Sequence, residues 1–234
     1  MSVEDDRLAS TEVALIDSVA KAEIKGLVAD LAELTIDSVL DNQLLEAVPV
    51  VGTVARFYRF AVTIHDRQFL RKVLSFLKEF EDASKEDRLR FADELAHDAG
   101  TRERAGAALA LLLDRLDNLD KPQIIGRLYV AALEHRLSLA ELRRFCMVVE
   151  RAYLPDLAAL SLLQSGDLVD KLAAPYLHAL GLVSLTGEDW GTFNGIGAET
   201  WYEVNDLGRQ FLAVAFPGVP PPSREPVINP VCVD

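Results

Sequence analysis

The chain has 234 residues, of which 50% are hydrophobic and 26% charged, and its formal net charge is −13 at pH 7. This length and apolar fraction suffice for one large or two small globular domains with a substantial core. The acidic balance argues against general affinity for nucleic acid, because binding to phosphates depends on accumulated Lys and Arg.

The first 150 residues predict a helical bundle, which we place over 10–150. Apolar residues recur at helical spacing over 10–34, and a short amphipathic helix is expected over 38–47. Ser84 and Ser138 begin capping-box patterns, and Gly100 marks a helix end. Thr101 then opens a helix with a leucine face, and Pro122 suits the first turn of the next helix. The face comprises Leu109, Leu112, Leu113, Leu116 and Leu119. Short junctions favour antiparallel neighbours.

The stretch over 48–80 is apolar and also holds the densest positive charge of the chain. Nothing breaks a helix between Thr53 and Ser84, so we expect a long helix over about 53–80. Between Arg56 and Lys78 there are six basic residues and one acidic residue. At about 100° per residue, an apolar face lies roughly opposite a basic face into which Leu74 intrudes. The basic face comprises Arg56, Arg59, Arg67, Arg71 and Lys78.

Three interpretations of this basic face compete. Its side chains could be solvated or paired with acidic helices of the same protein. The helix could instead lie on an anionic membrane surface, or contact an acidic protein or a nucleic-acid backbone. It does not suit a membrane span, because Arg56 and Arg59 would each cost about 2.5 to 3.5 kcal/mol near a bilayer centre.

Motifs that would indicate catalysis or a cofactor are missing from the sequence. The four histidines form no HExxH or HxxxH pattern, so we expect surface or capping positions for His65, His97, His135 and His178. No phosphate-binding loop, dinucleotide fingerprint or GxSxG elbow is present. We therefore expect no enzyme activity, no cofactor and no metal.

The two cysteines and the N-terminus bear on the cellular compartment. Cys146 lies in an apolar run and is predicted to be buried. Two cysteines, Cys146 and Cys232, are too few for a disulfide framework. The N-terminal MSVEDDRLAS lacks the basic and apolar regions of a signal peptide. We expect a cytoplasmic protein.

The pattern of the sequence changes after Leu154. A helix over 156–164 is followed by a second one that Asp167 caps and Gly181 ends. Extended segments at 182–185 and 201–204 flank a Gly-rich stretch, and Asn205 caps a last helix. The tail, 217–234, is Pro-rich and cannot be helical.

This order resembles the winged-helix fold over about 154–216. The residues that carry the resemblance are LGLV at 180–183 and YEVNDLGRQFL at 202–212, a strand-to-helix step found in many bacterial regulators. It implies a small α+β module over 151–216 with one β-hairpin, following the helical bundle of a mainly α protein. DNA binding is the function that it implies. Pro175 departs from the pattern, because it would kink the helix that reads DNA.

The charge of this module argues against DNA and for a protein partner. From Arg151 to Asp234 there are four basic and ten acidic residues, and the wing carries Glu188, Asp189 and Glu199 but no Arg or Lys. Phosphates should therefore be repelled. Aromatic residues in and beside the wing suit a protein contact. These are Trp190, Phe193 and Trp201, although Trp201 and Tyr202 could simply alternate between core and surface.

We therefore expect a non-enzymatic protein that binds another protein or itself through an acidic winged-helix-like module. A DNA-binding transcriptional regulator is the first alternative. A peripheral membrane protein that uses the basic helix over 53–80 is the second.

Overall fold

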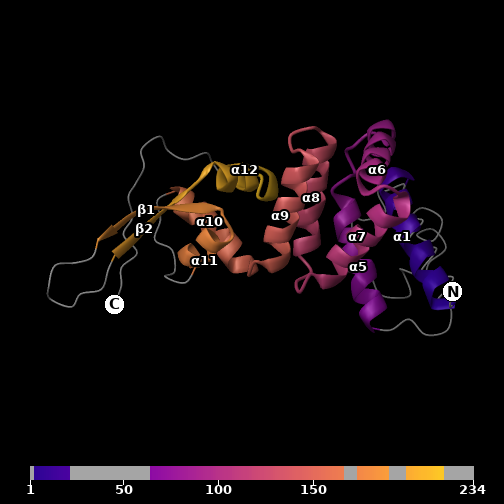
Figure 1. Ribbon diagram of the computed structural model, residues 1–234, viewed down its shortest axis with the longest axis horizontal. Coiled ribbons are helices and arrows are strands. Elements are labelled where there is room, and N and C mark those ends of the chain that lie inside the picture. The colour runs from indigo at the N-terminus through magenta and orange to yellow at the C-terminus, as the bar shows by residue number, and fades with distance from the viewer. Residues whose placement is uncertain (1–2, 22–63, 166–172, 190–198, 219–234) are drawn as a thin grey trace. The chain divides into compact units, whose positions relative to one another are not determined.

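The computed structural model describes residues 3–21, 64–165, 173–189 and 199–218 (Figure 1). Over these residues the protein is mainly α, with nine helices and one two-stranded antiparallel hairpin near the C-terminus. The predicted fold class is thereby confirmed. The chain divides into two compact units, Met1–Cys146 and Met147–Asp234, which are described separately.

The described part of the first unit consists of helices. These are α1 (Val3–Lys21), α5 (Ile64–Lys78), α6 (Lys85–Ala99), α7 (Arg102–Arg115), α8 (Lys121–Leu133) and the start of α9 (Leu139–Arg151), which continues into the second unit. The predicted segments 22–34, 38–47 and 53–63 lie outside the described residues. The first helix begins at Val3 rather than near residue 10, because Glu4, Asp5 and Asp6 favour a helix N-terminus.

Local caps fix the helix ends where the sequence predicted them. The Ser84 hydroxyl accepts from the backbone N–H of Asp87 at 3.1 Å, and Gly100 ends α6 in the left-handed region at φ 88°. Ser138 and Glu141 form a reciprocal capping box with bonds of 2.8 and 3.2 Å. Pro122 lies in the first turn of α8, as expected.

An aromatic cluster joins α5, α6 and α8 in the core of the first unit. Tyr129 packs edge-to-face against Phe76 and Phe91, with ring centroids 5.2 and 6.2 Å apart, and Phe80 lies 5.3 Å from Phe76. Burial raises the pKa of the Tyr129 phenol well above its ordinary value. Such rings supply large apolar areas and hold the three helices together.

The α1 helix packs against α7 and α6. Arg102 at the start of α7 connects all three helices, since it donates to Asp17 of α1 at 3.0 Å and also pairs with Asp93 of α6. At Gly106 an added Cβ would lie 1.9 Å from the backbone oxygen of Glu12, so the backbones of α7 and α1 come close together at this point. Glycine is required there by space.

The predicted leucine face of α7 is confirmed only in part. Leu109, Leu113 and Leu116 are buried, whereas Leu112 is half-buried. Leu116 is the C-cap residue of α7 and still lies on the buried face, whereas Leu119 lies four residues beyond the end of the helix at Arg115 and is exposed. The predicted leucine face was therefore wrong at Leu119.

The second unit contains three further helices and the hairpin. They are α10 (Leu154–Ser165), α11 (Ala173–Ala179), β1 (Val183–Asp189), β2 (Glu199–Val204) and α12 (Asp206–Ala215). The register runs from Val183 opposite Val204 to Asp189 opposite Glu199, with an irregularity between Leu185 and Gly187. Its core comprises Leu157, Leu160, Leu177, Val183, Val204 and Phe211.

The predicted elements of the second unit are present, with longer strands. Each extended segment was expected to span four residues, and the strands have seven and six. Pro175 is the third residue of described α11, and residue 171, whose carbonyl would accept an N–H at that position, lies outside the described residues, so the expected kink stays a prediction. The cap at Asp167 and the tail from 219 onward lie outside the described residues.

Gly126 should be intolerant of a side chain because α5 and α8 touch there. An added Cβ would lie 2.6 Å from the backbone oxygen of Phe76, which cannot move without displacing α5. We expect Gly126→Ala to lower the free energy of unfolding by about 1 to 3 kcal/mol. Urea unfolding followed by far-UV circular dichroism checks this. Gln123→Ala on the same helix is the control and should change stability by less than about 0.5 kcal/mol; equal stability of the two variants would contradict the prediction.

The packing of α1 should depend on pH through Glu12. Burial, and then the nearby Glu103 carboxylate, raise the pKa of Glu12 above its ordinary value of 4.5. The folded chain therefore binds this proton more tightly than the unfolded chain, and stability is lost as pH rises through the folded pKa. We expect Glu12→Gln to be more stable than the wild type near neutral pH and to lose this advantage below 4.5. Urea unfolding of both proteins over this range measures the difference, and a difference independent of pH would contradict it.

Candidate interaction surfaces

The described part of the basic face lies on α5. Arg67, Arg71 and Lys78 fall within roughly 40° of one another around the helix axis. Arg71 is exposed, whereas Arg67 and Lys78 are half-buried. Arg56 and Arg59 lie outside the described residues. The three described residues therefore form a short stripe on one helix.

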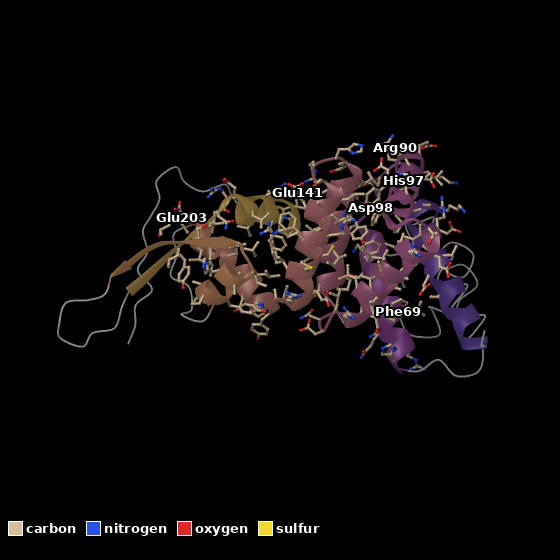
Figure 2. The ribbon with its side chains drawn as sticks, in the orientation of Figure 1. Phe69, Arg90, His97, Asp98, Glu141 and Glu203 are labelled. Carbon is tan, nitrogen blue, oxygen red and sulfur yellow. The ribbon has the colours of Figure 1, made fainter. Side chains whose placement is uncertain are left out.

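The opposite side of α5 is buried in the first unit. It comprises Leu70, Val73, Phe76 and Leu77, while Phe69, labelled in Figure 2, is half-buried. Leu74 lies only about 20° from Arg67 around the helix axis, on the basic side as predicted, and it is buried as well. Since α5 packs against α8 and α7, this apolar face is covered by protein.

Lys72 anchors α5 rather than contributing to a surface. Its ammonium is buried and donates to the backbone oxygen of Asp114 at 2.8 Å, one of the carbonyls that the last turn of α7 leaves without an intrahelical partner. Nearby, the buried Lys121 ammonium lies 2.6 Å from the Asp117 carboxylate and lowers the pKa of Asp117. Lys72 therefore joins α5 to the end of α7, and Lys121 joins the start of α8 to the junction that precedes it.

The LGLV segment of the second unit is a helix end. Gly181 adopts the left-handed conformation at φ 78° and donates to the backbone oxygen of His178 at 2.9 Å. Leu182 donates to the oxygen of Leu177 at 3.0 Å. These two bonds form a Schellman motif, and the buried side chains of Leu177 and Leu182 supply its usual apolar contact.

Asn205 connects this helix end to α12. Its backbone N–H donates to the oxygen of Leu182 at 3.2 Å, and its Nδ2 donates to the oxygen of Gly181 at 3.0 Å. Its Oδ1 accepts from the backbone N–H of Gly208 at 2.9 Å and so caps α12. An added Cβ on Gly208 would lie 2.1 Å from the Leu182 oxygen, which explains the glycine at this position.

Arg209 stabilises the same step from β2 to α12. Its guanidinium donates to the backbone oxygen of Val204 and, at 2.7 Å, to the Asp206 carboxylate. The conspicuous Gly-Arg pair of the sequence therefore holds the strand-to-helix step together. The other cation in the described part of this unit is Arg151, which is exposed at the end of α9.

The described residues of the second unit are strongly acidic, with seven carboxylates against these two arginines. The carboxylates belong to Glu150, Asp156, Glu188, Asp189, Glu199, Glu203 and Asp206. Glu203, labelled in Figure 2, is exposed on the hairpin. The register also places Glu188 and Asp189 at the strand end beside Glu199.

The aromatic residues predicted for the wing cannot be assigned a surface. Trp190 and Phe193 lie outside the described residues. Trp201 lies in β2 opposite Gly187, next to the register irregularity, and its side chain is outside the description. Tyr202 is half-buried, with its ring centroid 5.8 Å from that of His178. On this hairpin the structure describes the exposed side chain of the acidic residue Glu203.

Exposed apolar side chains elsewhere in the second unit were not singled out from the sequence. Tyr153 is 64% exposed and Leu162 is 46% exposed, both from the α10 region, while Met147 of α9 is 50% exposed and Leu185 of β1 is 40% exposed. The signal that could have revealed them is composition. The α10 sequence, LPDLAALSLLQS, has a single charge, so apolar residues must occur on its outer side as well as its inner side.

Groups that could support catalysis are dispersed. All four histidines are exposed, as predicted, and His178 donates from Nδ1 to the backbone oxygen of Val183 at 2.9 Å. Cys146 is buried, as predicted. In the described part of the chain, no three His, Cys, Asp or Glu side chains come together in a way that could hold a metal ion.

No helix within the described ranges combines the length and the apolar character needed to cross a membrane. Comparison with protein-family models finds no match, and neither the curated proteins nor the solved structures contain a significant one.

Asn205 should determine the stability of the second unit. We expect Asn205→Ala to lower its free energy of unfolding by about 1 to 2 kcal/mol, because the cap of α12 and the bond to Gly181 are lost together. Both tryptophans lie in this unit, so urea unfolding followed by tryptophan fluorescence reports on it. Asn205→Asp keeps the accepting oxygen but not the donor and should lose less. A loss for Asp as large as for Ala would show that the cap contributes nothing.

Proposed function

We propose that this chain is a non-enzymatic protein that acts by binding protein through its C-terminal unit, residues 147–218. The partner is another protein or a second copy of the chain. The observation that carries the proposal is the exposure of large apolar side chains there, foremost Tyr153 at 64%, Met147 at 50% and Leu162 at 46%. Exposed apolar surface on a water-soluble unit is characteristic of protein contacts.

The charge of this unit supports a protein partner over nucleic acid. Its described part carries seven carboxylates, and one of its two arginines, Arg209, is engaged by Val204 and Asp206. The exposed residues of α11, the helix that would read DNA in a winged helix, are Pro175, His178 and Ala179. Without Lys or Arg among the described residues of that helix, 173–179, little opposes the repulsion from phosphates there.

A DNA-binding regulator is the second candidate. The order of α10, α11, the hairpin and α12 is the order on which the resemblance to winged-helix regulators depends. This candidate requires binding through Arg151 or through residues outside the described ranges, because α11 offers no cation.

The membrane alternative is less well supported. It requires the apolar face of α5 to enter the headgroup region, and Leu70, Val73, Leu74 and Leu77 are buried among helices of the first unit. Exposing them would disrupt the core. A non-catalytic role and a cytoplasmic location belong to the same proposal.

The two leading candidates differ in their response to duplex DNA at low salt. A mobility-shift assay with random duplex at low ionic strength should show no binding, because electrostatic attraction is strongest there and still has too few cations to act on. Native mass spectrometry of the same purified chain should show a complex with itself or with a retained protein. Salt-sensitive binding of the duplex, abolished by Arg151→Glu, would instead establish the regulator. Isolated monomers without any partner would refute the proposal.

A further inference from the structure

The exposed side of α9 is basic, although the chain as a whole is acidic. Five residues of this helix are exposed, and at about 100° per residue they fall within an arc of about 100° around its axis. They are Ala140, Arg143, Arg144, Met147 and Arg151. We call these five residues the α9 stripe. Because all 13 residues of α9 belong to one continuous helix, the helix alone fixes the positions of the stripe residues relative to one another.

The α9 helix exposes no carboxylate beside these arginines. Its two acidic residues, Glu141 and Glu150, are half-buried. The Glu141 carboxylate accepts from the backbone N–H and the hydroxyl of Ser138 at 2.8 and 2.7 Å, so it caps the start of the helix. With His counted as neutral, α6 and α7 expose charges of both signs, and each remaining helix exposes at most one charged side chain among those described. Several exposed charges of a single sign therefore occur, within the described side chains, on α9 alone.

The arginines of the α9 stripe are largely available to a partner. Arg143 pairs with Asp98 of α6, yet its side chain stays 62% exposed. Exposed ion pairs of this kind are weak, so an incoming carboxylate can compete with Asp98. Arg144 and Arg151 form no ion pair with any described residue. Met147, which is 50% exposed, lies between these two at the i, i+3, i+7 spacing of one helix face.

We propose that the α9 stripe binds a short acidic segment of a partner protein, whose carboxylates face the arginines and whose apolar side chain rests on Met147. This inference rests on the proposed function and names the chemistry of the partner. The stripe extends about 12 Å along the helix axis from Arg143 to Arg151, a length that two or three helical turns of a partner can match. Arg and Met are both enriched in protein interfaces relative to the rest of a protein surface. The flexible thioether of Met147 adapts to different apolar side chains.

The net charge of −13 favours a short segment over a large polyanion. At physiological ionic strength, exposed charges more than about 8 Å apart are largely screened from one another, so a segment confined to the stripe is governed by the arginines. A nucleic-acid duplex or a second copy of this acidic chain extends far beyond the stripe and would meet carboxylates elsewhere on the surface. A phosphate backbone, moreover, offers no apolar group to Met147.

Fluorescence anisotropy with a labelled peptide tests the inference on the full chain at physiological ionic strength. The probe is EDLFEDLFEDLF, in which acidic pairs alternate with apolar pairs. We expect saturable binding, and Arg144→Glu and Arg151→Glu should each raise the dissociation constant by at least about tenfold, because each places a carboxylate opposite a carboxylate. Arg104→Glu is the matched control, since Arg104 is exposed on α7 and the change in net charge is the same; this variant should bind like the wild type. A second probe, EDSSEDSSEDSS, keeps the charges without the apolar residues and should bind more weakly.

The inference is wrong if the first probe does not bind, or if Arg104→Glu weakens its binding as much as the two α9 variants do. Equal binding of the two probes would contradict the contact with Met147. An oligothymidine that binds more tightly than the peptide, and is lost in the same variants, would replace the protein segment by nucleic acid. Unchanged far-UV circular dichroism shows that each variant is folded.

Native mass spectrometry separates failure of the inference from failure of the proposed function. A protein partner that the purified chain retains, and that persists in the double variant Arg144→Glu Arg151→Glu, upholds the proposed function and refutes its placement on α9. A retained partner that this double variant loses, together with the expected peptide binding, supports both. If neither a partner nor the probe binds, both fail.

Discussion

The second unit depends on one close backbone approach, where the end of α11 meets the start of α12. The Leu182 oxygen accepts from Asn205 and lies so near Gly208 that a side chain there would collide with it. Asn205 closes the arrangement by reaching Gly181 and capping α12 at the same time. Because the turn at Gly181 leads directly into β1 and Asn205 directly follows β2, this contact also fixes the base of the hairpin.

That structural role has a functional consequence. Arg209 completes the strand-to-helix step by binding the Val204 backbone, so the most conspicuous cation of the unit is committed to its own fold. The hairpin is left with carboxylates, and α10 and α11 are left with exposed residues that carry no Lys or Arg. We therefore propose that this unit presents its surface to protein rather than to DNA.

Local sequence signals predicted much of this architecture. Caps at Ser84, Ser138 and Asn205, and the helix ends at Gly100 and Gly181, depend on side chains acting on their own backbone neighbours, so they can be read from short segments. The orientation of α5 was less predictable. Leu74 had been assigned to the basic side, yet it is buried because α7 and α8 cover more of the helix than its own periodicity indicates. Such tertiary covering is not encoded within the helix itself.

The candidate surface was harder to predict than the fold. Attention to aromatic residues pointed to Trp190, Phe193 and Trp201, two of which lie outside the described residues, whereas the exposed residues of α10 are an ordinary alanine, leucine and proline. Whether they are buried is decided by the neighbours of α10, which sequence periodicity does not give. Hydrogen–deuterium exchange of the full chain with and without the EDLFEDLFEDLF peptide tests the central claim most directly. We expect amides of 139–151 to exchange more slowly in the presence of the peptide while those of α5 do not change. Slowing confined to α5, or no slowing anywhere, would contradict the account.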